Sequence, residues 1–168
     1  VSADPGTCDA AGVVLGTAVT ADNCGIGTLT NDAPASSPVG STIVTWVVTD
    51  ANGNSDSCTQ IITVTDGELP TIICANDVNV NANSGNCEAT GVSLGAPATT
   101  DNCSGGSVTN DAPSSFPVGT TTVTWVVIDI NGNTATCTQF VTVNSSVDTS
   151  ISVSGNTYTS NATGASYQ

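Results

Sequence analysis

Basic side chains are absent from this sequence of 168 residues. It contains no lysine, arginine or histidine beside 14 aspartates and glutamates, so its formal net charge is -14. Nucleic acids and anionic lipid surfaces attract proteins largely through basic side chains. We therefore expect no nucleic-acid partner. The sequence also lacks an apolar run of about 18 residues, which a membrane-spanning helix needs, so we expect no membrane insertion.

The same absences restrict catalysis. Without histidine no side chain titrates near neutral pH unless its environment shifts it, and without lysine no Schiff base can form. Paired carboxylates can hydrolyse glycosides. Sugar binding at such sites usually uses aromatic side chains, and the chain has only two Trp, two Tyr and two Phe. We expect a protein that is not an enzyme and that carries no organic cofactor.

Seven cysteines occur in a chain rich in Thr, Ser, Asn and Gly. No two of them form a C-x-x-C pair, and no histidine is present to complete a zinc site. This pattern favours disulfides and an oxidising, extracellular compartment. The sequence begins without Met and without a signal peptide, so we expect residue 1 not to be the natural start of the protein.

The sequence repeats itself in one constant register. The offset in residue number is 79, the difference between Cys8 and Cys87, and it also relates Cys24 to Cys103 and Cys58 to Cys137. Shorter strings recur in the same register, including Asn-Asp-Ala-Pro at 31–34 and 110–113 and Thr-Trp-Val-Val at 45–48 and 124–127. A repeat of this length suits a small domain rather than one unit of a solenoid or propeller.

Within each copy the pattern indicates short β-strands. Apolar residues alternate with their neighbours around Trp46 and around Trp125, as a half-buried strand requires, so we expect both tryptophans in the core rather than exposed for sugar stacking. The Asn-Gly sequences at 52–53 and 131–132 predict tight turns after these strands. No segment has a helical apolar stripe. The sequence therefore predicts an all-β fold of tandem immunoglobulin-like β-sandwich domains braced by disulfides.

Cysteine pairing is constrained by the repeat but not fixed by it. The second copy contains Cys74, Cys87, Cys103 and Cys137, which allow three pairings. We favour Cys74 with Cys137 and Cys87 with Cys103, hence Cys8 with Cys24. Cys58 then pairs upstream of residue 1, where the equivalent of Cys74 would lie. The alternative joins Cys58 to Cys74 and leaves Cys137 without an equivalent partner.

The ordered motifs resemble a known family. The segments Asp101-Asn102-Cys103, 116–125, 131–133 and 137–143 closely resemble the hyalin repeat, or HYR, module, which is an immunoglobulin-like sandwich of extracellular adhesion proteins. The resemblance implies a first repeat at 1–66 that lacks its N-terminal strand and a second at 67–144. Residues 145–168 depart from the register and resemble the start of a third, different β module.

The cysteine-rich, lysine-free version of the repeat is similar to the arrays in SprB-like giant adhesins of gliding bacteria, which the type IX system secretes. The resemblance implies a structural and adhesive segment of a large bacterial cell-surface protein, serving attachment or gliding motility. Its expected partners are neighbouring repeats, surface polysaccharide and other adhesin chains. The alternative is a non-catalytic spacer or carbohydrate-binding module of a secreted hydrolase.

Calcium is the one ligand that the sequence suggests. Two turns place oxygen-bearing side chains at alternate positions, although both lack the terminal Glu of a calcium loop. Two further acidic residues precede Leu69-Pro70 and are similar to the acidic linkers that calcium rigidifies in tandem sandwiches. The candidate ligands are Asp50, Asn52, Asn54, Asp129, Asn131, Asn133, Asp66 and Glu68. Solvated turns and a solvated hinge are the alternatives. For Asp101 and Asn102 we favour a cap on a disulfide-bounded turn over a binding role.

Overall fold

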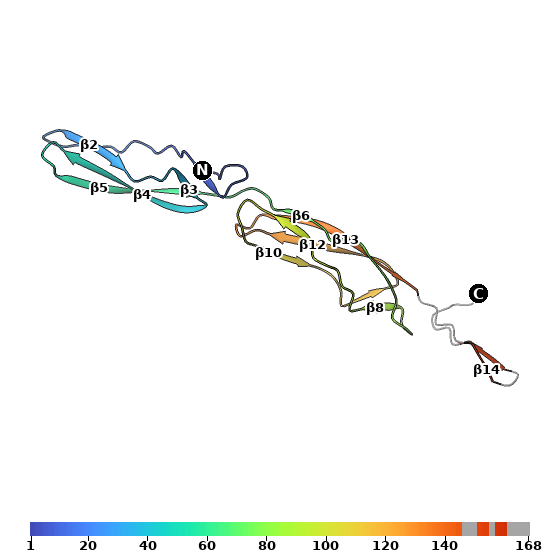
Figure 1. Cartoon of the computed structure of the whole chain (residues 1–168). Coiled ribbons are helices and arrows are strands. Elements are labelled where there is room, and N and C mark those ends of the chain that lie inside the picture. The colour runs from blue at the N-terminus through green and yellow to red at the C-terminus, as the bar shows by residue number, and fades with distance from the viewer. Residues whose placement is uncertain (146–150, 155–156, 161–168) are drawn as a thin grey trace. The chain divides into compact units, whose positions relative to one another are not determined.

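A computed structural model describes residues 1–145, 151–154 and 157–160, and all of their regular structure is β-strand (Figure 1). The chain forms two compact units. Unit 1 contains residues 1–69 together with 101–105 and 129–133, and unit 2 contains the remainder. Two loops from the second repeat of the sequence therefore belong to unit 1. The third module expected at 145–168 falls largely outside the described residues. Only residue 145 and the two short strands at 151–154 and 157–160 are described there.

Unit 1 has five strands in two antiparallel sheets. A three-stranded sheet has the order β2-β4-β5, and β1 pairs with β3. Its strands are β1 (Asp9–Ala11), β2 (Ile26–Asn31), β3 (Ser36–Pro38), β4 (Gly40–Asp50) and β5 (Ser55–Val64). A parallel bridge from Ser2 to Thr65 adds the N-terminal residues to this unit.

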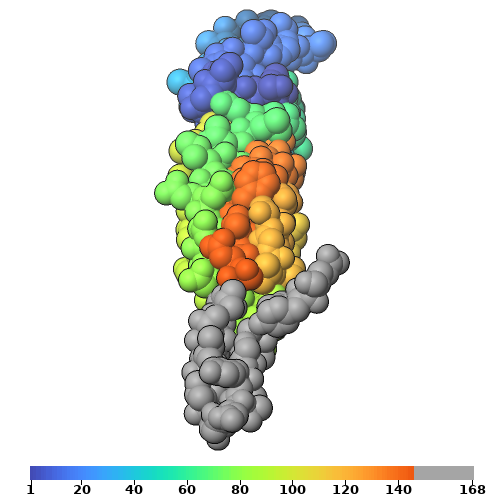
Figure 2. Space-filling model, turned by 90° about the vertical axis from the view of Figure 1, so that its right-hand side faces the viewer, coloured from blue at the N-terminus to red at the C-terminus, as the bar shows by residue number. Residues whose placement is uncertain are grey.

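Unit 2 repeats this arrangement with additional strands. The central sheet has the order β10-β12-β13-β7, with β7 parallel to β13, and smaller sheets pair β11 with β8 and β6 with β9. Figure 2 shows β13, in orange, beside β12 on the surface of this unit. The strands are β6 (Thr71–Ile73), β7 (Val78–Asn81), β8 (Glu88–Thr90), β9 (Ala98–Thr100), β10 (Ser107–Asn110), β11 (Ser115–Pro117), β12 (Gly119–Ile128), β13 (Thr134–Asn144), β14 (Ile151–Ser154) and β15 (Thr157–Ser160).

The hairpins form where the Asn-Gly turns were expected. Gly53 has φ of 91° and Gly132 has φ of 95°, a left-handed conformation that L side chains rarely adopt. These turns set the register of the paired strands, so Trp46 lies opposite Cys58 and Trp125 lies opposite Cys137. In an antiparallel pair, directly opposite residues point to the same face. Each cysteine therefore faces the same side of its sheet as the tryptophan.

Side chains from the central sheet and from the β8–β11 sheet of unit 2 share one core. Ala89 of β8 and Phe116 of β11 pack with Val123, Trp125 and the two buried valines of β13. Two sheets that bury their inner faces against each other form a sandwich. The expected all-β, immunoglobulin-like sandwich class with disulfides is confirmed.

The two expected core tryptophans differ in burial. Trp125 is 7% exposed within the core of unit 2, whereas Trp46 is only partly buried against a smaller core made by Ala10, Val44, Ile62 and Val64. Part of the difference comes from Ile72 and Cys74, which pack against the core that contains Trp125. Among the described residues, no helix is long and apolar enough to cross a membrane.

Candidate functional site

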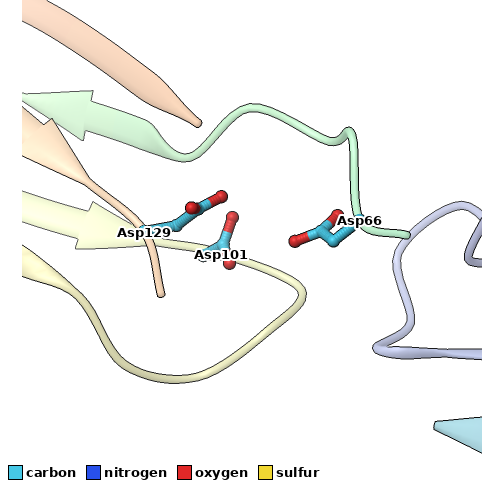
Figure 3. Close-up of side chains that lie close together, drawn as sticks. All are labelled: Asp66, Asp101 and Asp129. Atoms are coloured by element: carbon cyan, nitrogen blue, oxygen red, sulfur yellow. The ribbon is translucent and has the colours of Figure 1, made fainter. Parts of the chain in front are cut away.

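Three carboxylates converge in unit 1. Asp66, Asp101 and Asp129 each contribute an oxygen that lies within 4.8 Å of the oxygens of the other two, and their side chains point toward one another (Figure 3). Calcium binds oxygen ligands at about 2.3 to 2.6 Å, so two oxygens on opposite sides of the ion lie roughly 4.6 to 5.2 Å apart. The spacing of this acidic cluster, meaning Asp66, Asp101 and Asp129, is compatible with one shared calcium ion.

Several oxygens at the acidic cluster are buried without a hydrogen-bond donor. In the described part of the chain the buried side-chain atoms without a partner are Oδ2 of Asp66, Oδ1 of Asp101 and Oδ1 of Asn102. A buried polar atom that makes no hydrogen bond costs about 1–3 kcal/mol, and more when it is charged. All three are acceptors, and two belong to the cluster itself. A ligand that removed this cost would have to be a hydrogen-bond donor or a cation.

Charge balance at the cluster favours a cation. Two carboxylates about 4 Å apart repel by roughly 4 kcal/mol at an effective dielectric constant of about 20. The chain offers no side chain to offset this, because it has no lysine, arginine or histidine. The amino group of Val1 donates to the carbonyl oxygen of Thr63. Only a proton or a cation from solution can therefore neutralise the cluster, and three oxygens with an amide oxygen nearby form a hard ligand set that suits calcium.

Asp129 is held by its own turn. Its Oδ1 accepts hydrogen bonds of 2.8 Å from the backbone N–H groups of Asn131 and Asn133, and its Oδ2 accepts one of 2.8 Å from Nδ2 of Asn133. The side chain is only 5% exposed. Burial opposes ionisation, but the hydrogen bonds from Asn133, Asn131 and Gly132 outweigh it and hold the pKa of Asp129 below its ordinary 3.8. Asp129 therefore enters the cluster as a carboxylate.

Asp66 and Asp101 are oriented through neighbouring backbone and amide groups. Oδ1 of Asp66 accepts a 3.0 Å bond from the N–H of Glu68 and a 3.2 Å bond from Nδ2 of Asn102. Oδ2 of Asp101 accepts a 2.9 Å bond from the N–H of Cys103. Each carboxylate thus uses one oxygen for the fold and leaves the other buried in the cluster.

Asn102 also fixes the neighbouring disulfide. Its Nδ2 donates a 2.8 Å bond to the carbonyl oxygen of Thr7, the residue before Cys8. Cys8 and Cys103 are bonded, with their Cα atoms 4.8 Å apart. The acidic cluster and this disulfide therefore lie at the same place in unit 1, where segment 101–105 meets the loop that contains Thr7.

The structure brings together only part of the calcium set expected from sequence. Asp66 and Asp129 lie in the acidic cluster, whereas Glu68 and Asp50 do not. Oε2 of Glu68 instead accepts a 2.8 Å bond from the N–H of Gly6. Sequence reasoning missed Asp101 as a cluster member and read it as a cap, which it also is. Asp101 lies near Asp66 only in the folded chain, and no local sequence pattern indicates that proximity.

In the first of the two expected calcium turns the aspartate accepts hydrogen bonds from residues of its own turn. Oδ1 of Asp50 accepts 2.8 Å bonds from the N–H groups of Asn52 and Asn54, and its Oδ2 accepts a 2.7 Å bond from Nδ2 of Asn54. The equivalent turn at Asp129, Asn131 and Asn133 has the same pattern of bonds. In both turns the aspartate organises the loop by accepting from it, and only the second turn lies in the acidic cluster.

The disulfides correct part of the expected pairing. Cys74 is bonded to Cys137, the pair that was favoured, so the alternative bond between Cys58 and Cys74 is not present. Cys103 is bonded to Cys8, not to Cys87, and Cys8 is therefore not bonded to Cys24. The physical reason is that segment 101–105 packs in unit 1, beside Cys8. Exposed free thiols remain on Cys24, Cys58 and Cys87.

Comparison with known proteins places these features in a family. The family model described as HYR domain matches residues 5–64 and 65–143. Hyalin of Strongylocentrotus purpuratus is 37% identical over 124 residues, covering 70% of this chain. Hyalin of Lytechinus variegatus is 35% identical over 116 residues, covering 66% of it. The chain spans 10% and 22% of the lengths of these two relatives. With both repeats matched over most of their length, this chain belongs to the HYR domain family.

Proposed function

We propose that this chain is a structural and adhesive repeat segment of a large secreted protein on a bacterial cell surface, where it serves attachment or gliding motility. The observation that carries this proposal is the tandem match of both repeats to the HYR domain, a family represented by hyalin. The two disulfides fit an extracellular, oxidising location. In this proposal the repeats of the array, together with neighbouring parts of the same protein, form the adhesive surface.

The composition supports a role without catalysis. The chain has no histidine, lysine or arginine, and in its one carboxylate cluster among the described residues four of the six carboxylate oxygens accept hydrogen bonds that hold the fold. The absence of lysine and arginine also removes every site at which trypsin-like proteases cut. Resistance to such proteases suits a protein segment that is exposed outside the cell.

Antibodies raised against the folded chain test this proposal on intact cells of the source organism. The expected result is surface labelling without permeabilisation, with Fab fragments that reduce attachment or gliding in proportion to their occupancy. Labelling that requires permeabilised cells contradicts the surface location. Labelling without any effect of the Fab fragments on attachment and gliding contradicts the adhesive role and favours the spacer of a secreted hydrolase. A glycan array probed with the purified chain tests the carbohydrate-binding alternative.

A second candidate function, cation binding, is favoured by the buried acceptor oxygens at the acidic cluster. We propose that calcium binds there through Asp66, Asp101 and Asp129, with Oδ1 of Asn102 as a further ligand. The ion would join segments 101–105 and 129–133 to residue 66 and so stiffen unit 1. Extracellular calcium modules have dissociation constants on the order of 10⁻⁴–10⁻³ M. At a calcium concentration 100 times the dissociation constant, binding adds about 2.7 kcal/mol to the free energy of unfolding.

Calorimetric titration of the chelator-treated chain with calcium tests this candidate. The expected result is one site per chain and a melting temperature that rises with calcium and falls again with chelator. Magnesium should do less, since it prefers shorter bonds and retains its water. Equal heats and equal melting curves with and without calcium contradict the site while leaving the adhesive role untouched.

A further inference from the structure

The two disulfides of the chain overlap in sequence. Cys8 is bonded to Cys103 and Cys74 to Cys137, pairs that are 95 and 63 residues apart. One end of each bond therefore lies between the two ends of the other. Bonds closed inside each copy of the repeat would form separate or nested loops. The overlapping bonds instead form one connected covalent path from Cys8 to Cys137.

Tension applied to the two ends of the chain takes the shortest covalent path once it has broken the noncovalent contacts. From Cys8 this path crosses directly to Cys103. Two arms then reach the second bond, one back along the chain to Cys74 over 29 residues and one forward to Cys137 over 34. The direct segment from Cys8 to Cys74 is 66 residues long. It lies in parallel with the 29-residue arm, so it stays slack.

The slack segment contains most of the first repeat. Strands β1 to β6 lie within residues 9–73, together with the core around Val44. A fully stretched chain extends by at most about 3.3–3.6 Å per residue. By this measure the chain reaches about 240 Å with both bonds intact and roughly 580 Å without them. The two bonds therefore remove more than half of the length that unfolding could release.

Hydrogen bonds support the place where the tension crosses between the segments. Nδ2 of Asn102 donates a 2.8 Å bond to the carbonyl oxygen of Thr7, so the residues that precede Cys8 and Cys103 are joined directly. Cys103 itself is fully buried. These contacts position the two cysteines for their bond during oxidative folding, whereas Cys24 remains an exposed free thiol.

We propose that this chain is a tether of limited length, in which the overlapping disulfides carry tension past residues 9–73. The inference rests on the proposed adhesive role, because a segment that joins a cell to a surface is pulled from its ends. Noncovalent contacts alone do not set such a limit, since folded domains are marginally stable and a steady pull unfolds them. The covalent path keeps the attached cell close to the surface even after the strands have separated.

Single-molecule force spectroscopy of the whole chain, held at its two ends with free thiols blocked, tests the proposal. The stretched length should be about 240 Å and should increase by roughly 330 Å after complete reduction. The Cys8→Ser variant should be about 120 Å longer than the unaltered chain, because the tension then runs along the chain from residue 8 to Cys74. The stretched length depends on covalent connections, so a variant that folds poorly still reports it.

The Cys74→Ser variant distinguishes overlapping bonds from bonds within each copy. It should be only about 10 Å longer than the unaltered chain, because the arm from Cys103 to Cys137 already carries the tension. With Cys8 bonded to Cys24, and the equivalent bond in the second copy, the same variant would be roughly 160 Å longer. The matched control is Cys24→Ser, which removes a free thiol and should leave the stretched length unchanged.

Three results overturn the proposal. These are a stretched length near that of the reduced chain before any reductant is added, a large increase in Cys74→Ser, and any increase in Cys24→Ser. Each of them leaves the adhesive role untouched, because the purified chain is pulled without a partner. Failure of the antibody test on cells removes the adhesive role and does not alter the stretched lengths, so the two failures are distinguishable.

Discussion

Nε1 of Trp125 donates a hydrogen bond of 3.0 Å to Oε1 of Gln139 on the neighbouring strand, within the core of unit 2. Gln139 is fully buried, and its Nε2 donates to the carbonyl oxygens of Asn76 at 2.6 Å and Leu94 at 2.9 Å. One amide therefore satisfies the indole and two loop carbonyls. In unit 1 the bond from Trp46 to Gln60 has the same length, but Gln60 is only partly buried.

Replacing Gln139 by leucine should lower the free energy of unfolding of the second repeat by about 3 kcal/mol, because the buried indole N–H of Trp125 and two loop carbonyls lose their partner. The matched change Gln60→Leu should lower the free energy of unfolding of the first repeat by only about 1 kcal/mol, because solvent can reach that site and replace the lost hydrogen bond. Hydrogen exchange in a urea series, read separately for β12–β13 and for β4–β5, measures both changes. Equal costs at the two sites would contradict the role of burial.

Much of the fold could be predicted because its signals are local. The alternation around Trp46 and Trp125 and the Asn-Gly turns specify strands and hairpins whatever lies elsewhere in the chain. The constant repeat register then shows that both copies share one fold. A strand pattern does not determine how much of a tryptophan is covered, so the difference in burial between Trp46 and Trp125 could not be predicted.

The pairing of Cys8 could not be predicted for a different reason. A repeat register identifies equivalent cysteines, but bonds within one copy and bonds between successive copies use the same set of equivalent residues. The pairing favoured for the second copy, Cys87 with Cys103, carried over by the register to a bond within the first copy between Cys8 and Cys24. The structure instead places 101–105 in unit 1, where the hydrogen bond from Asn102 to Thr7 brings Cys103 to Cys8. The same long-range placement explains why Asp101 was missed as a member of the acidic cluster.

Digestion after glutamate tests the pairing directly. Glu68 and Glu88 are the two glutamates of the chain, so complete cleavage gives fragments 1–68, 69–88 and 89–168. With free thiols blocked and no reductant, Cys8–Cys103 and Cys74–Cys137 should hold all three fragments in one species. The Cys8→Ser variant should release fragment 1–68. Its release from the unaltered chain before reduction would show that Cys8 is not bonded to Cys103.

The turn at Asp50 predicts a loss of stability in acid. Hydrogen bonds from the side chain and then the backbone N–H of Asn54, with smaller ones from Asn52 and Gly53, lower the pKa of Asp50 below 3.8 against the opposing effect of burial. A carboxyl whose pKa is lower in the folded state stabilises the protein above its unfolded pKa, and this contribution is lost as the pH falls through the folded value.

The Asp50→Asn variant should therefore melt at a lower temperature than the unaltered chain at neutral pH, and the difference should shrink as the pH is lowered from about 5 toward 1. Thermal unfolding across this range measures it. The control is Asp56→Asn, which removes the same formal charge outside the turn. A difference that grows with acidity would contradict the assignment.

The calcium site is best tested by two equivalent aspartates. Asp101 and Asp22 occupy the same position in the two copies, and each accepts a hydrogen bond from the N–H of the cysteine two residues later. Asp101→Asn and Asp22→Asn therefore remove a comparable turn contact, but only Asp101 belongs to the acidic cluster. Without calcium, Asp101→Asn should also relieve repulsion between carboxylates, so we expect it to melt no lower than Asp22→Asn.

With calcium present the order of the two variants should reverse. The unaltered chain and Asp22→Asn should gain the same increase in melting temperature, whereas Asp101→Asn should gain little, because the variant loses one of three anionic ligands. Calorimetric titration of each variant with calcium gives the affinities independently, and we expect Asp101→Asn to bind at least tenfold more weakly, about 1.4 kcal/mol. If both variants respond to calcium alike, the ion binds elsewhere and the three carboxylates serve only to hold the fold.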